Sequence, residues 1–305
     1  MIVVGLKEKL LDFYDKKYKL LMIIPILLII FAMGQIAYQT YQTGDFVHKG
    51  VGLKGGSAIT LYKESPVKEM QSFLDSKFPG EGISVREITS AGKTLGLVID
   101  SERQDKDGVA QLVAAIKEQS GADAKEYTVE IVGSSLGESF FKQTIWAVII
   151  AFIVMGIVVF AYFRQPIPSL AVIAAGASDI IVTLAIFNLT GMKLGTAGVA
   201  AFLMLIGYSI DTDMLLTSRV LKRKEGTEIE KIIGAVKTGL TMTITTIAAV
   251  VVSLIFIESE IVKQIMLILL IGLFVDMIMT WIQNVGIIRL YLEHQRKKAH
   301  AAIKN

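Results

Sequence analysis

Long apolar runs divide the chain into membrane-spanning and polar parts. The runs cover residues 20–38, 144–163, 169–189, 194–217, 239–257 and 261–290. Apolar runs of about 18 or more residues are typical of transmembrane helices. The last run is long enough for one span of about 20 residues followed by an amphipathic continuation. The pattern predicts a polytopic α-helical membrane protein with six transmembrane helices.

The polar segment between the first two runs, residues 40–143, has the pattern of a small folded domain. Short strand-like stretches occupy residues 57–62, 82–89, 94–100 and 125–133, and helical spacing occupies residues 66–78 and 105–121. Ala91, Gly92 and Lys93 form the predicted hairpin turn between the second and third strands. The order β-α-β-β-α-β predicts an inserted ferredoxin-like α+β domain. This fold hosts many activities, so it specifies no function by itself.

Basic residues indicate how the spans are oriented, because lysine and arginine accumulate in cytoplasmic flanks. They cluster before the first run, in the loop 218–238 and after the last run, at Lys16, Lys17, Lys19, Arg219, Lys222, Arg223, Lys224, Arg296, Lys297 and Lys298. Both termini are therefore predicted to be cytoplasmic and residues 40–143 extracytoplasmic. The resulting division is a cytoplasmic segment 1–19, a first span 20–39, the domain 40–143, a five-helix bundle 144–290 and a cytoplasmic tail 291–305.

The first run is interpreted as a membrane anchor that stays in the protein. Its apolar core is longer than the 7–15 residues usual in a signal peptide, and no small-x-small cleavage site follows it. The basic clusters are interpreted as topology signals, and no nucleic-acid partner is expected.

Composition narrows the function further. The 305 residues are 53% hydrophobic, carry a net charge of +3 and include no cysteine. The absence of cysteine excludes structural disulfides and thiol catalysis. Because the polar insert contains no nucleophile–base pair and no metal-ligand cluster, we expect a protein that is not an enzyme and needs no cofactor.

Four aspartates lie inside the apolar runs: Asp179 in the third, Asp211 and Asp213 in the fourth, and Asp276 in the sixth. An isolated charge at the centre of a membrane costs at least about 2.5–3.5 kcal/mol, so such residues are candidates for function. Asp211 and Asp213 are about 200° apart around a helix, so they cannot share one face. One is expected to face the helix bundle, and the other a second partner or a water path.

Hydroxyl side chains accompany these carboxylates. In the fifth run, Thr238, Thr241 and Thr245 have helical spacing, Thr246 is adjacent, and Ser209 precedes Asp211 in the fourth. We predict a proton-responsive cluster at mid-membrane, with Asp211 as first candidate and Asp213, Asp179 and Asp276 as the others. Thr241, Thr245, Thr246 and Ser209 are predicted to form a supporting polar face. The alternative is that some of these groups only form hydrogen bonds between helices.

Four stretches carry a family resemblance: "GVGLKGGSAITLY" from Gly50, "VGSSLGESF" from Val132, "ASDIIVTLAIF" from Ala177 and "IGYSIDTDMLLTSRV" from Ile206. Together with the order of one span, a large domain and five spans, they resemble the SecF family of protein-export membrane proteins. That family belongs to the resistance-nodulation-division (RND) superfamily. The resemblance implies pairing with a SecD-like subunit, association with the Sec translocon, contact with a translocating polypeptide and use of the proton-motive force.

The sequence departs from the bacterial members in ways that indicate the archaeal branch. Bacterial members read Gly-Tyr-Ser-Ile-Asn-Asp-Thr, so their aspartate aligns with Thr212 here. The resemblance makes Gly55, Gly56 and Gly207 family-motif glycines. Glycine allows positive φ and close backbone approach. Gly55 and Gly56 are therefore predicted to form a tight joint where the chain passes from the first span to the opening strand.

Three other classes were considered. A self-sufficient RND exporter of lipids or small molecules carries two copies of the six-span unit, whereas this chain has one, so half of such an exporter remains the alternative. An intramembrane aspartyl protease requires a Gly-x-Gly-Asp element with a Tyr-Asp partner inside its spans, and neither is present in the apolar runs. A membrane scaffold would not need acids on three spans.

Overall fold

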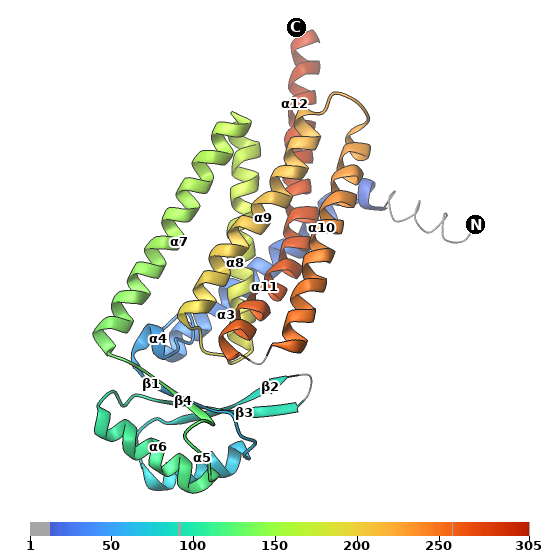
Figure 1. Ribbon diagram of the computed structural model, residues 1–305. Helices are drawn as coiled ribbons and strands as arrows, with labels where there is room; N and C mark the ends of the chain where they lie inside the picture. Colours follow the sequence, from blue (N-terminus) through green and yellow to red (C-terminus); the bar gives the residue numbers. More distant parts are fainter. Residues whose placement is uncertain (1–12, 91–92, 258, 305) are drawn as a thin grey trace, which may run out of the picture.

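The computed structural model describes residues 13–90, 93–257 and 259–304. A bundle of long helices forms one part of the molecule, and a small α+β domain covers one end of it (Figure 1). The C-terminal helix protrudes from the opposite end. The chain enters and leaves the α+β domain at the same end of the bundle, so the domain is an insertion.

Within the described residues, six helices are long and apolar enough to cross a membrane. The short helix α2 (Tyr18–Leu21) leads into α3, and α11 continues through the π-helical turn η1 into α12. The bundle elements are α3 (Ile23–Thr43), α7 (Ser134–Phe163), α8 (Pro166–Leu189), α9 (Thr196–Lys222), α10 (Glu228–Phe256), α11 (Glu260–Ile278), η1 (Met279–Asn284) and α12 (Val285–Lys304). The six predicted spans are thereby confirmed, although α3, α7 and α10 extend several residues beyond their apolar runs.

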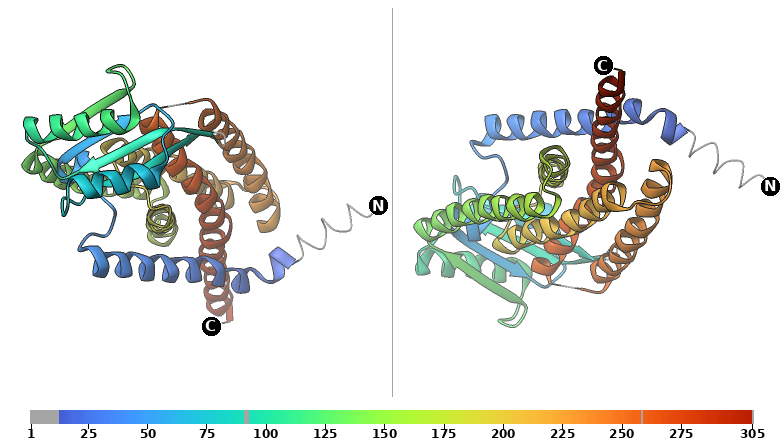
Figure 2. Two further views of the ribbon diagram at one scale, coloured as in Figure 1. Left: turned by 90° about the horizontal axis from the view of Figure 1, so that it is seen from below. Right: turned by 90° about the horizontal axis from the view of Figure 1, so that it is seen from above.

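The helices form a buried centre and an exposed periphery. About half of the most apolar part of α8, α9 and the α11–α12 helix is buried within the chain, whereas α3, α7 and α10 are mostly exposed. α3 crosses one side of the bundle obliquely and packs on α8 (Figure 2). Exposed apolar side chains on the peripheral helices match a lipid environment. The central helices are the ones that carry Asp179, Asp213 and Asp276.

The α+β domain has the predicted order of elements. It consists of β1 (Gly56–Leu61), α5 (Val67–Lys77), β2 (Ser84–Ser90), β3 (Lys93–Ser101), α6 (Lys106–Ser120) and β4 (Tyr127–Val132). The sheet order is β2-β3-β1-β4, and every neighbouring pair is antiparallel. Alternate apolar side chains of the sheet pack on α5 and α6 in a core that includes Ile59, Leu97 and Leu112. Both helices lie on one face of the sheet, and the other face points towards the bundle (Figure 1).

Local sequence signals account for the ends of α6. The side chain of Asp105 accepts a hydrogen bond from the Gly108 N–H, which satisfies a free donor of the first turn. Gly121 ends the helix in the left-handed conformation, as its sequence position predicts. In the hairpin between β2 and β3, Ala91 and Gly92 of the predicted turn lie outside the described residues, and Lys93 begins β3.

Polar contacts join the N-terminal segment to the end of the bundle that lies away from the α+β domain. The Arg289 guanidinium on α12 donates to the Asp15 carboxylate at 2.6 Å and to the Glu228 carboxylate at the start of α10 at 3.1 Å. The Tyr14 hydroxyl donates to the Trp281 carbonyl in η1. Residues 13–21, the start of α10 and α12 therefore meet at one end of the molecule.

Candidate functional site

Three of the four intramembrane aspartates lie buried in the centre of the bundle. Asp179 on α8 and Asp213 on α9 are fully buried, and Asp276 on α11 is 1% exposed. Each comes from a different central helix. The structure thus brings together three carboxyl groups in a region from which water and lipid are both excluded.

Helix α9 places the polar groups between α8 and α11. Ser209, Thr212 and Asp213 have i, i+3, i+4 spacing, so they share one face of this helix. The Ser209 hydroxyl donates to Oδ2 of Asp179. The Thr212 hydroxyl lies 3.1 Å from both carboxylate oxygens of Asp276. One face of α9 therefore contacts the acidic groups of both neighbouring helices.

The π-helical turn η1 completes the cluster. Asn284 Nδ2 donates to Oδ1 of Asp213 at 2.7 Å, and Thr280 donates to Oδ1 of Asp276 at 2.9 Å. Gln283 Nε2 donates to the Ser178 hydroxyl on α8 at 3.1 Å. Because a π-turn forms i→i+5 bonds, it rotates the residues after Asp276 relative to an α-helix, and such turns are frequent at functional sites.

Thr280, Gln283 and Asn284 were not among the site residues predicted from the sequence. These three residues are polar within the long sixth apolar run, and this polarity could have marked them as site residues. The length of the run gave no indication that it contains a π-turn. The amide pair Gln283-Asn284 interrupts an otherwise apolar stretch, and buried amides in a span usually contact another polar group.

The cluster contains more buried polar atoms than hydrogen bonds. Oδ1 of Asp179, Oδ2 of Asp213, Oδ1 of Asn284 and Oε1 of Gln283 are buried without a hydrogen-bond partner among the described residues. The partners that the carboxylates do have are hydroxyl and amide groups. Three buried negative charges held only by neutral donors would be very costly.

Asp211 lies outside this cluster. Its side chain is exposed on the opposite side of α9 from Asp213, as the angle between the two residues requires. Gly207, Tyr208 and Met204 are exposed on the same side, and a side chain added at Gly207 would meet nothing within 4 Å. The structure of the single chain therefore leaves an open strip on α9 with a carboxylate in it.

The predicted threonine face is also separate from the aspartates. Thr241 and Thr245 are exposed, and their hydroxyls donate to carbonyls of their own helix, those of Lys237 and Met242. Thr246 also bonds to the Met242 carbonyl. A threonine hydroxyl on a helix readily satisfies its hydrogen-bonding capacity by donating to a carbonyl of the preceding turn. Of the predicted supporting groups, Ser209 alone contacts a buried aspartate in the described part of the chain.

The family-motif glycines Gly55 and Gly56 pack closely against other backbone segments, one of which is the start of α7. Their φ angles are +89° and +122°. A Cβ on Gly55 would lie 2.5 Å from Cα of Ser134, at the start of α7, and a Cβ on Gly56 would lie 2.5 Å from the Ser101 carbonyl oxygen. The short helix α4 (Val51–Lys54) separates both from the first span. The joint therefore lies at the start of β1, as predicted from the position of the two glycines, and it also brings β1 against the start of the second span.

These features define a multi-pass membrane protein with an inserted α+β domain and a buried acidic cluster. The model of the family "Protein export membrane protein SecD/SecF, C-terminal" matches residues 112–294. The protein-export membrane protein SecF of Pyrococcus furiosus is 38% identical over 96% of this chain and 97% of its own length. SecF of Methanocaldococcus jannaschii is 37% identical over 93% of this chain and 99% of its own. The chain belongs to the SecF family and is an accessory subunit of the Sec protein-export machinery.

Solved structures show the same fold. The crystal structure of SecDF from Thermus thermophilus, described as a translocon-associated membrane protein, superimposes with a TM-score of 0.75 at 18% identity over 91% of this chain. SecDF in the super-membrane-facing form gives a TM-score of 0.60 at 19% identity. This chain spans 38% and 39% of the lengths of those two chains.

Proposed function

We propose that this chain is the SecF-type half of a proton-driven export machine and that its buried acidic cluster responds to protons. The observation that carries the proposal is the meeting of Asp179, Asp213 and Asp276, on three helices, with only hydroxyl and amide partners. The proposed energy source is the proton gradient, with no cofactor, and the proposed role is not enzymatic.

The proposed cycle follows from the electrostatics of a buried carboxyl group. A carboxylate open to one side of the membrane takes up a proton and loses its charge, and the three helices repack. Opening to the other side releases the proton. Moving one charge across 100 mV supplies about 2.3 kcal/mol, enough to shift a two-state equilibrium more than tenfold.

We place the α+β domain outside the cell and both termini in the cytoplasm. The N-terminal segment, the connection between α9 and α10, and the C-terminal helix lie at the end of the bundle away from the α+β domain (Figure 1). The basic clusters belong to those three segments. This arrangement supports the proposal, because cytoplasmic flanks carry the excess of lysine and arginine.

The exposed strip of α9 is the proposed contact with the SecD-like subunit. Met204, Gly207, Tyr208 and Asp211 form this strip at helical spacing. An intramembrane carboxylate facing lipid is costly, so Asp211 requires a polar partner, and the described part of this chain provides none. A flat strip around Gly207 also allows the close helix approach that small residues permit in membranes. The Sec translocon and the translocating polypeptide are the further proposed partners.

The test replaces each aspartate by asparagine, which keeps the shape of the protonated acid but cannot titrate. Asp213→Asn, Asp179→Asn and Asp276→Asn should each assemble with the SecD-like subunit and lose gradient-dependent stimulation of export in membrane vesicles. Asp211→Asn serves as the comparison. Normal stimulation in the triple variant would refute the proposal for the buried cluster. Loss of stimulation in Asp211→Asn alone, with the SecD-like subunit still co-purifying, would identify the exposed carboxylate as the proton carrier instead.

A further inference from the structure

The connection between α8 and α9, residues 190–195, is held against the segment that leads into the α+β domain. The Gly50 N–H donates to the Leu194 carbonyl at 2.8 Å, and the Leu194 N–H donates to the His48 carbonyl at 2.6 Å. Lys49 and Leu194 form a parallel β-bridge. The connection is thus fixed by backbone hydrogen bonds on its outer side.

A side chain from α11 holds the inner side of the same connection. Gln264 Oε1 accepts from the Gly195 N–H at 3.0 Å, and its Nε2 donates to the Lys193 carbonyl at 2.6 Å. Gln264 is 7% exposed. A Cβ on Gly198 would lie 2.8 Å from Gln264 Oε1, so the absence of a side chain there makes room for the amide.

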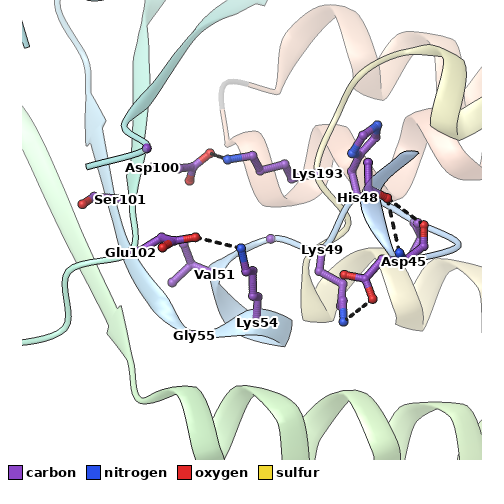
Figure 3. Close-up of a pocket in the computed structure, with 14 residues that line it drawn as sticks. Asp45, His48, Lys49, Val51, Lys54, Gly55, Asp100, Ser101, Glu102 and Lys193 are labelled. Carbon is purple, nitrogen blue, oxygen red and sulfur yellow. Dashed lines mark hydrogen bonds and ion pairs between the residues drawn. The ribbon is translucent and has the colours of Figure 1, made fainter. Parts of the chain in front are cut away.

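The Lys193 side chain extends from this connection to the sheet. Its Nζ lies 3.0 Å from Oδ2 of Asp100 on β3, across the cleft between the domain and the bundle (Figure 3). Asp100 also pairs with Arg86 on β2 at 3.2 Å, and its side chain is only 6% exposed. A carboxylate held by two cations in a largely buried site fixes the position of the loop relative to the sheet.

These contacts unite the three helices that carry the acidic cluster. Asp179 lies on α8, Asp213 on α9 and Asp276 on α11, and Gln264 ties the start of α11 to the loop that joins the other two. We infer that Gln264, Lys193 and Asp100 form a clasp that transmits repacking of these helices to the α+β domain. This inference rests on the proposed function, and it assigns the coupling to residues that lie three or more helical turns from the carboxylates.

The cleft offers a second ion pair as a matched control. Lys54 Nζ lies 2.9 Å from Oε1 of Glu102 (Figure 3), and this contact holds the pKa of Glu102 below its ordinary value. The side chains of Lys54 and Glu102 are 59% and 73% exposed, so the pair contributes little to stability. Lys54 belongs to α4, which carries no intramembrane aspartate. Loss of this pair should leave the coupling intact.

The experiment measures the distance between domain and bundle in the whole protein with its SecD-like partner. Because the chain has no cysteine, spin labels can be placed at Ser72→Cys on α5 and Lys224→Cys between α9 and α10, both exposed. Distance distributions are recorded in proteoliposomes with and without an imposed proton gradient. In the protein with an unmodified clasp and in Lys54→Ala, the distance between the labels should change when the gradient is imposed. In Gln264→Leu and Lys193→Ala, this distance should not change.

Each outcome separates the two proposals. A shift that persists in both Gln264→Leu and Lys193→Ala overturns the clasp and leaves the proposed function intact. Absence of a shift in the unmodified protein also overturns the clasp, because no movement then reaches the domain, and the export assay of the aspartate variants decides the proposed function separately. Co-purification with the SecD-like subunit shows whether Gln264→Leu still folds. If Gln264→Leu does not fold, Asp100→Asn removes the ion pair with Lys193 from the domain side and takes its place in the experiment.

Discussion

At the scale of single residues, two aspartates close together on α9 differ in burial. Asp213 is buried and bonded to Asn284, whereas Asp211, two residues earlier, is exposed. The helical period predicts that the two face apart, but the period does not say which side is covered. That is decided by where α8 and α11 pack, which depends on the whole bundle. Sequence alone could therefore identify the carboxylates and could not rank them.

Thr212 tests the energetic role of the hydroxyl groups in the cluster. Thr212→Val keeps the shape of the side chain and removes one donor to Asp276. We expect a loss of stability of about 0.6 kcal/mol and at most about 1.7 kcal/mol, the average and the largest value from double-mutant cycles on hydrogen bonds between membrane helices. The measurement is unfolding of the purified protein in detergent.

Thr241→Val is the control for this prediction. The Thr241 hydroxyl is exposed and bonds to a carbonyl of its own helix, so its loss should change stability by a few tenths of a kcal/mol or less. Equal losses of stability in the two variants would show that the hydrogen bond to Asp276 does not contribute more to stability than a hydrogen bond within one helix.

At the scale of elements, regular patterns were predictable and local irregularities were not. Apolar runs identified six spans, and alternation with turn residues identified the βαββαβ order. The helix α4 and the π-turn η1 left no periodic signal, since α4 has four residues and η1 lies inside a continuous apolar helix. Both irregular elements position residues of the candidate site and the glycine joint. The π-turn η1 brings Asn284 within hydrogen-bonding distance of Asp213, and α4 places Gly55 against α7.

The contact of α4 with α7 depends on glycine on both sides. A Cβ on Gly137 would lie 2.5 Å from the Gly55 nitrogen. Gly55→Ala and Gly137→Ala should each force the two elements apart, and Gly56→Val should strain both its positive φ and its contact with Ser101. We expect impaired export in cells at an unchanged protein level.

Gly133→Ala is the matched control for the joint, because a Cβ there meets nothing within 4 Å. Its export activity should equal that of the unchanged protein. Normal export by Gly55→Ala, Gly137→Ala and Gly56→Val would indicate that this region is a plain flexible linker.

At the scale of the whole molecule, the exposed strip of α9 defines a side that the single chain leaves uncovered. Gly207→Leu adds a side chain where nothing lies within 4 Å, so the isolated chain should keep its stability. The same bulk should block close approach of a partner helix. We therefore expect markedly reduced co-purification with the SecD-like subunit.

Gly34→Leu provides the control on another side of the bundle. Gly34 lies on α3, is exposed and likewise has nothing within 4 Å of an added Cβ. It should leave co-purification unchanged. Full recovery of the SecD-like subunit with Gly207→Leu would show that the two subunits meet elsewhere.

The strand order of the α+β domain also has a consequence for how the protein is made. β1 lies inside the sheet, and Gly56 at its start pairs with Val132 at the end of β4. Of its two neighbours in the sheet, β1 can pair with β3 first and lacks β4 until the last strand of the domain has been synthesised. α7 begins at Ser134, directly after β4. We therefore expect completion of the domain and insertion of the second span to be linked during synthesis, since they involve adjoining residues.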